Sequence, residues 1–431
     1  MSAERFASSD PRARIALAAL HLVFGDSYAR DFGIALWDGT RVEPEGTARF
    51  VLRVNAPGAL RAAFAPPCDL NAGRAFGAGL IDVDGDLEHA TDLFYRANRS
   101  WRARDFLLLV RLLRRLPRAS ETRVGEARLR GRIHSRQRDR AAVDFHYDRP
   151  IEFYGSFLDH DLIYSCAYWD AGIATLDAAQ SAKLDYTLSK LRVRPGERIL
   201  DIGCGWGALV IRAAQRFGAL ALGITLSRMQ YEEAQRRIAA ASLQDRARVE
   251  LRDYRELRGE RFDKIVSIGM FEHVGRARFP QYFRAAYEAL RPGGLFLNHA
   301  IADQSADRHR WRARGFLGRF IFPDGELVSV AEALGFAERA GFEVRDVENL
   351  REHYTRTLRA WVANLERNCG TAIAAAGEQS YRIWRLYLAG SAQGFRVGRL
   401  GIFQSLLARP HADGRVDLPS TRHDLYQPVN G

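Results

Sequence analysis

From about residue 175 onward, short apolar runs alternate with longer segments of helical periodicity. Five runs have the length and composition of buried strands, at the spacing of β–α units: Glu197–Gly203, Ala219–Ser227, Arg248–Tyr254, Phe262–Val274 and Gly293–Ile301. Two later runs, Phe342–Leu350 and Leu400–Pro410, predict further strands. Strands that alternate with helices form parallel sheets with helices on both faces. The pattern therefore predicts an α/β fold, with a doubly wound, Rossmann-like sheet within residues 141–431.

The first 100 residues have a different pattern, which predicts a smaller α+β domain. Alternation in "ARFVLRVN" (Ala48–Asn55) predicts a strand, and "WDGT" (Trp37–Thr40) and "DVDGD" (Asp82–Asp86) have the composition of turns. We expect residues 1–100 to form this domain.

Residues 101–140 are expected to link the two domains. Trp101–Leu116 has an apolar helical pattern that ends before Pro117, and the whole stretch carries 13 Arg against 4 acidic residues. One interpretation is a solvated, partly disordered tether. The other is a basic amphipathic segment that lies on anionic lipid headgroups.

Composition narrows the range of partners. The net charge of +12 over 431 residues suits an anionic partner, such as nucleic acid or an acidic membrane surface. Four cysteines lie far apart without a C-x-x-C pair, so we expect neither a disulfide framework nor a metal site, and a reducing compartment. We find no signal peptide and no apolar stretch of about 18 residues, so any membrane contact is expected to be peripheral.

A glycine-rich segment, "LDIGCGWGAL" (Leu200–Leu209), lies between a predicted strand and a helix. A dinucleotide site would have G-x-G-x-x-G and an acidic residue at the tip of the next strand. Here Gly203, Gly205 and Gly207 have G-x-G-x-G spacing, and the next strand ends without an acid. Asp201 at the end of a strand, followed at once by these glycines, is typical of S-adenosylmethionine methyltransferases.

Polar side chains follow the next two strands. Thr225, Ser227 and Gln230 offer hydroxyl and amide groups where an acid often binds the ribose diol. Asp253 and Tyr254 come after the third strand, near the expected adenine pocket. These five residues are candidate cofactor contacts.

The fourth and fifth strands end in ionisable residues. Glu272 and His273 lie in "GMFEHVG", and His299 lies in "LNHAI". Each alone would be a helix cap or a buried polar group, but the carboxyl ends of neighbouring parallel strands face one crevice. Their pairing therefore indicates chemistry.

Taken in order, these motifs resemble the cyclopropane-fatty-acyl-phospholipid synthase family, which includes the mycolic acid cyclopropane synthases. The resemblance spans about Phe145–Pro410 and includes "HYD", "YSCAYW", "LDIGCGWG", "GMFEHVG", "HAI", "FIFPDGEL" and "ENLREHYTRTLRAW". In addition, "FGAGLIDVDGDL" (Phe76–Leu87) is similar to the lipid-handling N-terminal domain of bacterial members.

The resemblance implies methyl transfer from S-adenosylmethionine to a cis double bond of a lipid acyl chain. A carbocation forms, loses a proton and closes a cyclopropane ring. It also implies a bound bicarbonate ion as the base, held by Cys166, Glu272, His299, the Ile301 backbone and Tyr354. Because Glu272 would lie beside an anion, its pKa should be raised. Cys166 as a covalent nucleophile is the alternative, although no base lies beside it in sequence.

The aromatic segment His146–Asp170 then has a function. An alkene is a poor nucleophile, so it must be aligned with the sulfonium methyl group in a dry cleft, and aromatic faces favour cations there. Candidates to face the sulfonium and the developing cation are Tyr147, Tyr164, Tyr168 and Trp169. With Ser165, Tyr147 and Tyr164 are also candidate cofactor contacts. Core positions are expected for Phe145, Phe153 and Phe157.

One departure from the family pattern follows "HYD". Many members have a polar Ser-Asn stretch where this chain has Arg149-Pro150-Ile151, so the loop over the cofactor should differ in shape.

Three alternative functions stay open: a methyl- or methylene-branched product, a small-molecule methyltransferase, or a silent lipid-binding module. The expected partners are unsaturated phospholipid and an anionic membrane surface, without nucleic acid. We expect a cytoplasmic protein on the inner face of the membrane, and a homodimer is compatible with this interpretation.

Overall fold

The computed structural model describes residues 9–25, 31–44, 46–97, 103–119, 125–147, 149–305 and 315–426. The chain forms two compact units. Unit 1 comprises residues 1–127, 314–321 and 362–394, and unit 2 comprises residues 128–313, 322–361 and 395–431. The chain therefore divides differently from the three consecutive segments expected, because later segments return to unit 1.

Unit 1 contains a four-stranded sheet of order β2-β1-β3-β4, in which only the β1–β3 pair is parallel. Its strands are β1 (Phe32–Leu36), β2 (Arg41–Val42), β3 (Phe50–Val54) and β4 (Ile81–Gly85). Its helices in the first 127 residues are α1 (Pro11–Phe24), α3 (Ala59–Phe64), α4 (Asp69–Gly77), α5 (Leu87–Ala97) and α6 (Ala103–Arg114). The strand expected at Ala48–Asn55 and the turn at Trp37–Thr40 are confirmed. The turn expected at Asp82–Asp86 is wrong for Asp82–Gly85, because those residues pair with β3 in β4.

Helix α6 is part of the core of unit 1. Leu109 and Leu113, with Leu116 just beyond the helix, are at most 1% exposed and pack in the same apolar cluster as the β1 and β3 side chains. Their i, i+4, i+7 spacing places them on one helix face. The disordered-tether interpretation is therefore wrong for residues 103–116, while Trp101 lies outside the described residues.

Unit 2 is built on a seven-stranded sheet of order β10-β11-β9-β8-β5-β6-β7. Its strands are β5 (Arg198–Ile202), β6 (Leu220–Thr225), β7 (Ala247–Leu251), β8 (Phe262–Ile268), β9 (Leu290–Asp303), β10 (Glu343–Asn349) and β11 (Leu400–Ala408). Strands β5 to β9 are parallel, and β11 is antiparallel to both β9 and β10. All seven predicted strands are present.

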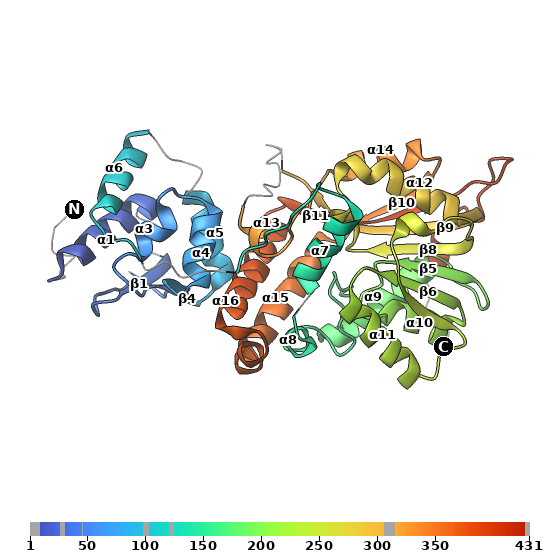
Figure 1. The fold of residues 1–431 in the computed structure, drawn as a ribbon, viewed down its shortest axis with the longest axis horizontal. Helices are drawn as coiled ribbons and strands as arrows, with labels where there is room; N and C mark the ends of the chain where they lie inside the picture. The colour runs from blue at the N-terminus through green and yellow to red at the C-terminus, as the bar shows by residue number, and fades with distance from the viewer. Residues whose placement is uncertain are drawn as a thin grey trace. The chain divides into compact units, whose positions relative to one another are not determined.

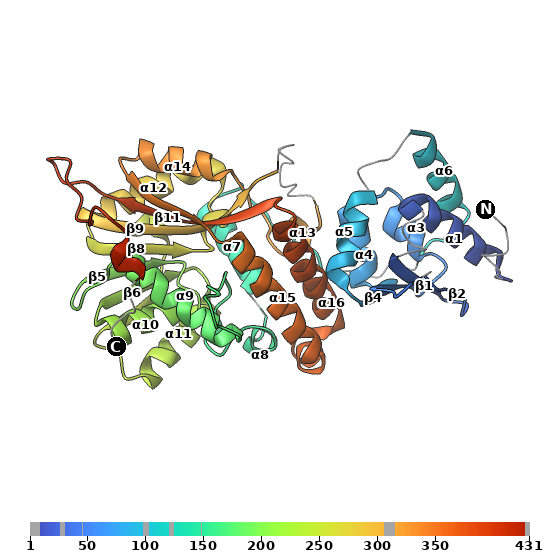
Figure 2. The same ribbon diagram turned by 180° about the vertical axis from the view of Figure 1, so that it is seen from behind.

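Helices cover both faces of this sheet (Figures 1 and 2). Alternate residues of one strand point to opposite faces. Accordingly, Ile199 of β5 packs in the apolar cluster of α9 (Leu176–Lys190), α10 (Ala208–Phe217) and α11 (Arg228–Ala240), whereas Leu200 packs in the cluster of α12 (Phe279–Ala289) and α14 (Val330–Arg339). The doubly wound Rossmann-like α/β prediction is therefore confirmed.

The remaining elements are α7 (Arg136–Tyr147), α8 (Ile151–Gly155), η3 (Tyr254–Glu256), η4 (Phe271–His273), η5 (Arg276–Arg278), α13 (Phe316–Phe320), α15 (Arg351–Arg367), α16 (Cys369–Arg396) and η6 (His423–Tyr426). Pro150 directly precedes α8, and Arg149 donates to the Phe145 and His146 carbonyls at the end of α7. Among the described helices, none is long and apolar enough to cross a membrane.

Candidate active site

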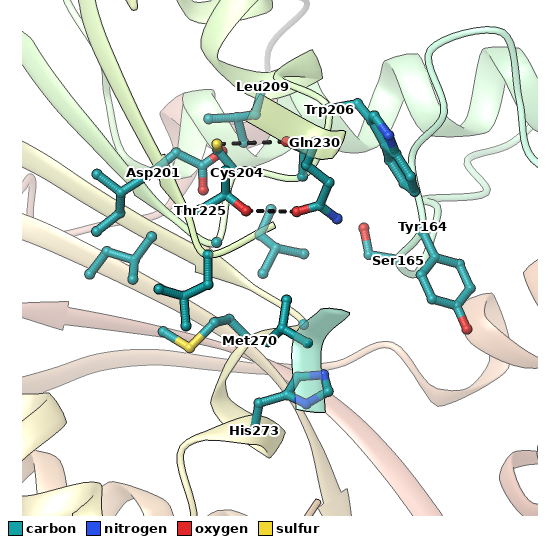
Figure 3. A pocket seen from close by; sticks show the side chains of 18 of the residues that line it. Tyr164, Ser165, Asp201, Cys204, Trp206, Leu209, Thr225, Gln230, Met270 and His273 are labelled. Atoms are coloured by element: carbon teal, nitrogen blue, oxygen red, sulfur yellow. Dashed lines mark hydrogen bonds between the residues drawn. The ribbon is translucent and has the colours of Figure 1, made fainter. Parts of the chain in front are cut away.

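A pocket in unit 2 opens at the carboxyl ends of β5, β6 and β7, where ligands bind in open α/β sheets (Figure 3). Most of the expected cofactor contacts line it: Tyr147, Tyr164, Ser165, Asp201, Gly203, Gly205, Thr225, Gln230, Asp253 and Tyr254. Gly207 and Ser227 do not line it.

The backbone of the glycine loop shows why Gly203 and Gly205 line the pocket and Gly207 does not. Gly203 (φ 82°) and Gly205 (φ 54°) both have left-handed backbones, and a Cβ on Gly203 would lie 2.8 Å from the Met270 Cβ. Gly207 (φ 86°) caps α10 instead, and a Cβ there would lie 3.1 Å from the Ala234 Cβ. The first two glycines thus form the pocket floor, and the third brings α10 against α11.

At the carboxyl end of β6, two polar side chains are hydrogen-bonded to each other. The Thr225 hydroxyl donates to the Gln230 side-chain oxygen at 2.8 Å, which leaves the Gln230 amide hydrogens for a ligand (Figure 3). Ser227 is the N-cap of α11, where its hydroxyl accepts from the Gln230 N–H. Its hydroxyl oxygen thus helps to start the helix.

Beyond β7, charged groups pair with one another. Arg255 donates to Asp253 at 2.6 Å and to Asp139 of α7 at 3.0 Å. The Asp253 carboxylate also accepts from the Arg255 N–H, so Arg255 holds it in place. Asp139, Val143 and Tyr147 are spaced four residues apart, so one face of α7 forms a wall of the pocket.

Sequence reasoning missed several lining residues. Trp206 of the glycine loop, Met270, and Lys183 of α9 all line the pocket, as does His273, which was noted only as a strand-end residue. A hint for Trp206 lay in its position between two of the glycines. Nothing in the local sequence of Lys183 distinguishes it from a surface lysine.

Glu272 lies in η4, just after β8, and His299 lies in β9, where it pairs with Ile268 at the end of β8. The Glu272 side chain accepts from the Ile301 N–H at 2.6 Å, and the His299 carbonyl accepts from the N–H of Gly269, which lines the pocket. His299 is fully buried, and its Nδ1 lies 3.3 Å from the Gln404 side-chain nitrogen. Within the described residues, neither Glu272 Oε2 nor His299 Nε2 has a hydrogen-bond partner. Buried polar atoms without partners are rare, so these two suit a ligand.

Cys166 and Tyr354 reach the same region through Leu350. The Cys166 thiol lies 3.8 Å from the Leu350 carbonyl, which also accepts from the Tyr354 N–H, and the Leu350 N–H donates to Ile402. Ile402 pairs with Ile301 between β11 and β9. These contacts bring the segments that carry Cys166 and Tyr354 close to β9, which carries His299 and Ile301.

Comparison with known proteins shows the family of this chain. The family model described as mycolic acid cyclopropane synthetase matches residues 134–405. The chain belongs to this family. A probable fatty acid methyltransferase of Pseudomonas putida is 38% identical over 96% of this chain and 98% of its own length.

Two solved structures of the family are also similar. The cyclopropane synthase MmaA2 from Mycobacterium tuberculosis is 35% identical, with a TM-score of 0.60 over 62% of this chain and 98% of that one. The mycolic acid cyclopropane synthase CmaA1, complexed with SAH and CTAB, is 37% identical, with a TM-score of 0.59 over 62% and 97%. This member of the family is therefore an S-adenosylmethionine-dependent methyltransferase.

Burial controls the charges in this synthetase-family site. It raises the pKa of Glu272 to about 7 and lowers that of His273 to about 4. It also lowers the pKa of His299 well below its usual value, with Lys183 and Lys190 adding to the effect, so this imidazole is neutral. Because burial raises the pKa of Cys166 far above its usual range, its thiol stays protonated, which argues against a covalent nucleophile.

The aromatic side chains separate into two groups. Tyr147 and Tyr164 line the pocket, and Tyr164 also packs on Trp361, which contacts Tyr354. Tyr168 stacks on His353 at 4.7 Å, and the Trp169 indole donates to Thr357, so both pack against α15 and do not line the pocket. Phe153 and Phe157 are fully buried as expected, whereas Phe145 is only half-buried.

Proposed function

We propose that the protein converts a cis double bond in an unsaturated phospholipid acyl chain into a cyclopropane ring. The observation that carries the proposal is that two buried atoms, Glu272 Oε2 and His299 Nε2, have no hydrogen-bond partner within the part of the chain that the structure describes. Methyl transfer to an alkene leaves a carbocation that must lose a carbon-bound proton, so a proton acceptor has to be held in the dry site.

The residues around this pair fit a small anion. When bound, S-adenosylmethionine supplies an electrophilic methyl group and bicarbonate supplies a proton acceptor. Glu272, with a pKa of about 7, can carry a proton and donate to an anion, and His299 can donate from Nε2 when Gln404 donates to its Nδ1. Since the Ile301 N–H already donates to Glu272, we assign Ile301 to orienting that carboxyl group rather than to holding the anion.

A second candidate product is a methyl- or methylene-branched chain, which the same residues would permit if the proton left elsewhere. The similarity to a probable fatty acid methyltransferase over nearly the whole chain favours it. Incubation with S-adenosylmethionine and vesicles of monounsaturated phospholipid, followed by NMR of the acyl chains, separates the products. Cyclopropane methylene signals support the first proposal, exocyclic methylene or branched methyl signals the second, and an unmodified lipid contradicts both.

Helix α6 supports an anionic membrane surface as partner, with the protein acting from the cytoplasm on the inner leaflet. Phe106, Leu107 and Leu108 are consecutive and are 38%, 57% and 46% exposed. Leu107 shares its helix face with Arg111 and Arg114, opposite the buried leucines. Apolar side chains surrounded by arginines suit the headgroup region of an anionic bilayer.

Replacing Arg111, Arg114 and Arg115 together by Gln should weaken binding to anionic vesicles. Each basic residue near such a surface contributes about 1 kcal/mol at low ionic strength. Vesicle sedimentation at low and high salt measures the loss. The matched control replaces three exposed arginines of unit 2, Arg228, Arg246 and Arg258, and should bind as before. Equal binding by both triple variants at low salt would contradict a specific role for α6.

A further inference from the structure

A buried lysine lies in the wall of the cofactor pocket. Lys183 of α9 is 2% exposed and lines the pocket with Ser165 and Asp201. Its ammonium group donates to the Ser165 hydroxyl at 2.9 Å. Among the described residues this is its only hydrogen bond, and no carboxylate lies within the 4.0 Å of an ion pair. An ammonium group has three donors, and burying it without an anion is costly.

Helix α9 is bound to the segment before it, which carries Ile163 and Ser165, and this contact positions the lysine. One turn before Lys183, the fully buried Gln180 donates to the carbonyls of Ile163 and Ser165, at 3.1 and 2.9 Å. Gln180 and Lys183 therefore occupy one helix face, and together they fix both the backbone and the hydroxyl of Ser165. Ser165 and the ammonium group form a single donor site at the edge of the pocket.

The other cations near the pocket have partners. Arg255 is paired with Asp253 and Asp139, and Arg252 with Glu250 and Glu260. On α9 itself, Lys190 is equally buried but binds Glu348 and lies 3.8 Å from Asp346. Lys183 thus differs from each of them in having positive charge to offer a ligand.

The sheet order decides which end of the cofactor meets this charge. The pocket extends from β7, where Asp253 and Tyr254 suit adenine, past the polar tip of β6 to Asp201 at the end of β5. The opposite end from adenine is the methionine part, which carries an ammonium and a carboxylate group. Asp201 and Lys183 offer a carboxyl and an ammonium group there. Burial raises the pKa of Asp201 to about 7, and the neighbouring Lys183 opposes that rise.

We propose that Lys183, together with the Ser165 hydroxyl, recognises the carboxylate group of the methionine moiety of S-adenosylmethionine. The alternative is a structural role, in which Lys183 only offsets the buried carboxyl groups of Asp159 and Asp201. The proposal rests on S-adenosylmethionine as the cosubstrate and is independent of the lipid product.

The test compares two ligands in one variant. S-Adenosylhomocysteine has the carboxylate group, whereas 5′-methylthioadenosine lacks the whole amino-acid part. Calorimetric titration of Lys183→Met should show S-adenosylhomocysteine binding weakened by about 10- to 100-fold, as expected for a lost charge-assisted contact. Binding of 5′-methylthioadenosine should stay within about 2-fold of the original. Equal losses for both ligands, or none for S-adenosylhomocysteine, would overturn the proposal.

Two further variants serve as a matched control and as a second, independent test. Lys190→Met removes an equally buried lysine from the same helix and should leave the ratio of the two affinities unchanged. Ser165→Ala should weaken S-adenosylhomocysteine selectively but less than Lys183→Met, and it carries the test if Lys183→Met does not fold. An unchanged ratio in Ser165→Ala would also contradict the shared donor site.

Discussion

Glu272→Gln, Cys166→Ser and Tyr354→Phe should each slow product formation by about 10²- to 10³-fold, the usual cost of losing one preorganised group of this kind. Binding of S-adenosylmethionine and lipid should stay within a few-fold, because these residues lie beside the cofactor pocket and do not line it. Glu272→Gln tests the proton itself, since it keeps the size of the side chain and a hydrogen-bond donor but cannot ionise. The measurement is initial rate on vesicles of unsaturated phospholipid.

Bicarbonate tests the same site directly. In degassed buffer the activity of the unchanged protein should fall, and added bicarbonate should restore it. The weaker of the three variants should be partly rescued at high bicarbonate, because mass action refills a loosened site. Full activity of the unchanged protein without bicarbonate would exclude a bound anion as the base, and Glu272 or His299 would then be the base.

Gly205→Val should abolish measurable cofactor binding, with a loss on the order of 100-fold or more from two effects. A β-branched residue is strained at a φ of 54°, at a cost of about 1–3 kcal/mol. Its side chain would also project from the pocket wall into the open space that the cofactor is expected to fill. Titration with S-adenosylhomocysteine measures the loss. His299→Ala should bind the same ligand within a few-fold, because His299 does not line the pocket.

A matched glycine separates strain from contact. Gly196 also has a positive φ, of 82°, and open space at its Cβ, but it lies in the exposed turn before β5 and outside the pocket. Gly196→Val should lower the melting temperature to a similar extent and leave S-adenosylhomocysteine affinity unchanged. If Gly196→Val and Gly205→Val lose the ligand equally, the effect of Gly205→Val is one of stability and not of binding.

The sheet and the glycine loop could be predicted because their signals are local. Strands such as β6 (LALGIT) and β11 (LGIFQSLLA) are largely apolar runs, although β10 (EVRDVEN) is mostly charged. The G-x-G-x-G spacing follows its strand within a few residues. The turn predicted at Asp82–Asp86 was wrong because its aspartates and glycine have the composition of a turn. The pairing of β4 with β3 overrides that preference, which only the tertiary fold reveals.

The sequence by itself determined the fold class, the family, the glycine loop and ten of the residues that line the cofactor pocket. The tertiary structure alone decided which of them act elsewhere: Ser227 and Gly207 belong to helix starts, and Tyr168 and Trp169 pack on α15. It also decided that the Ile301 N–H binds Glu272, and that Lys183 donates to Ser165 without an ion pair among the described residues. These facts depend on contacts between segments far apart in the chain, such as Cys166 with Leu350 and His299 with Gln404. Burial and partners at such distances arise only when helices pack on the sheet, so no local pattern encodes them.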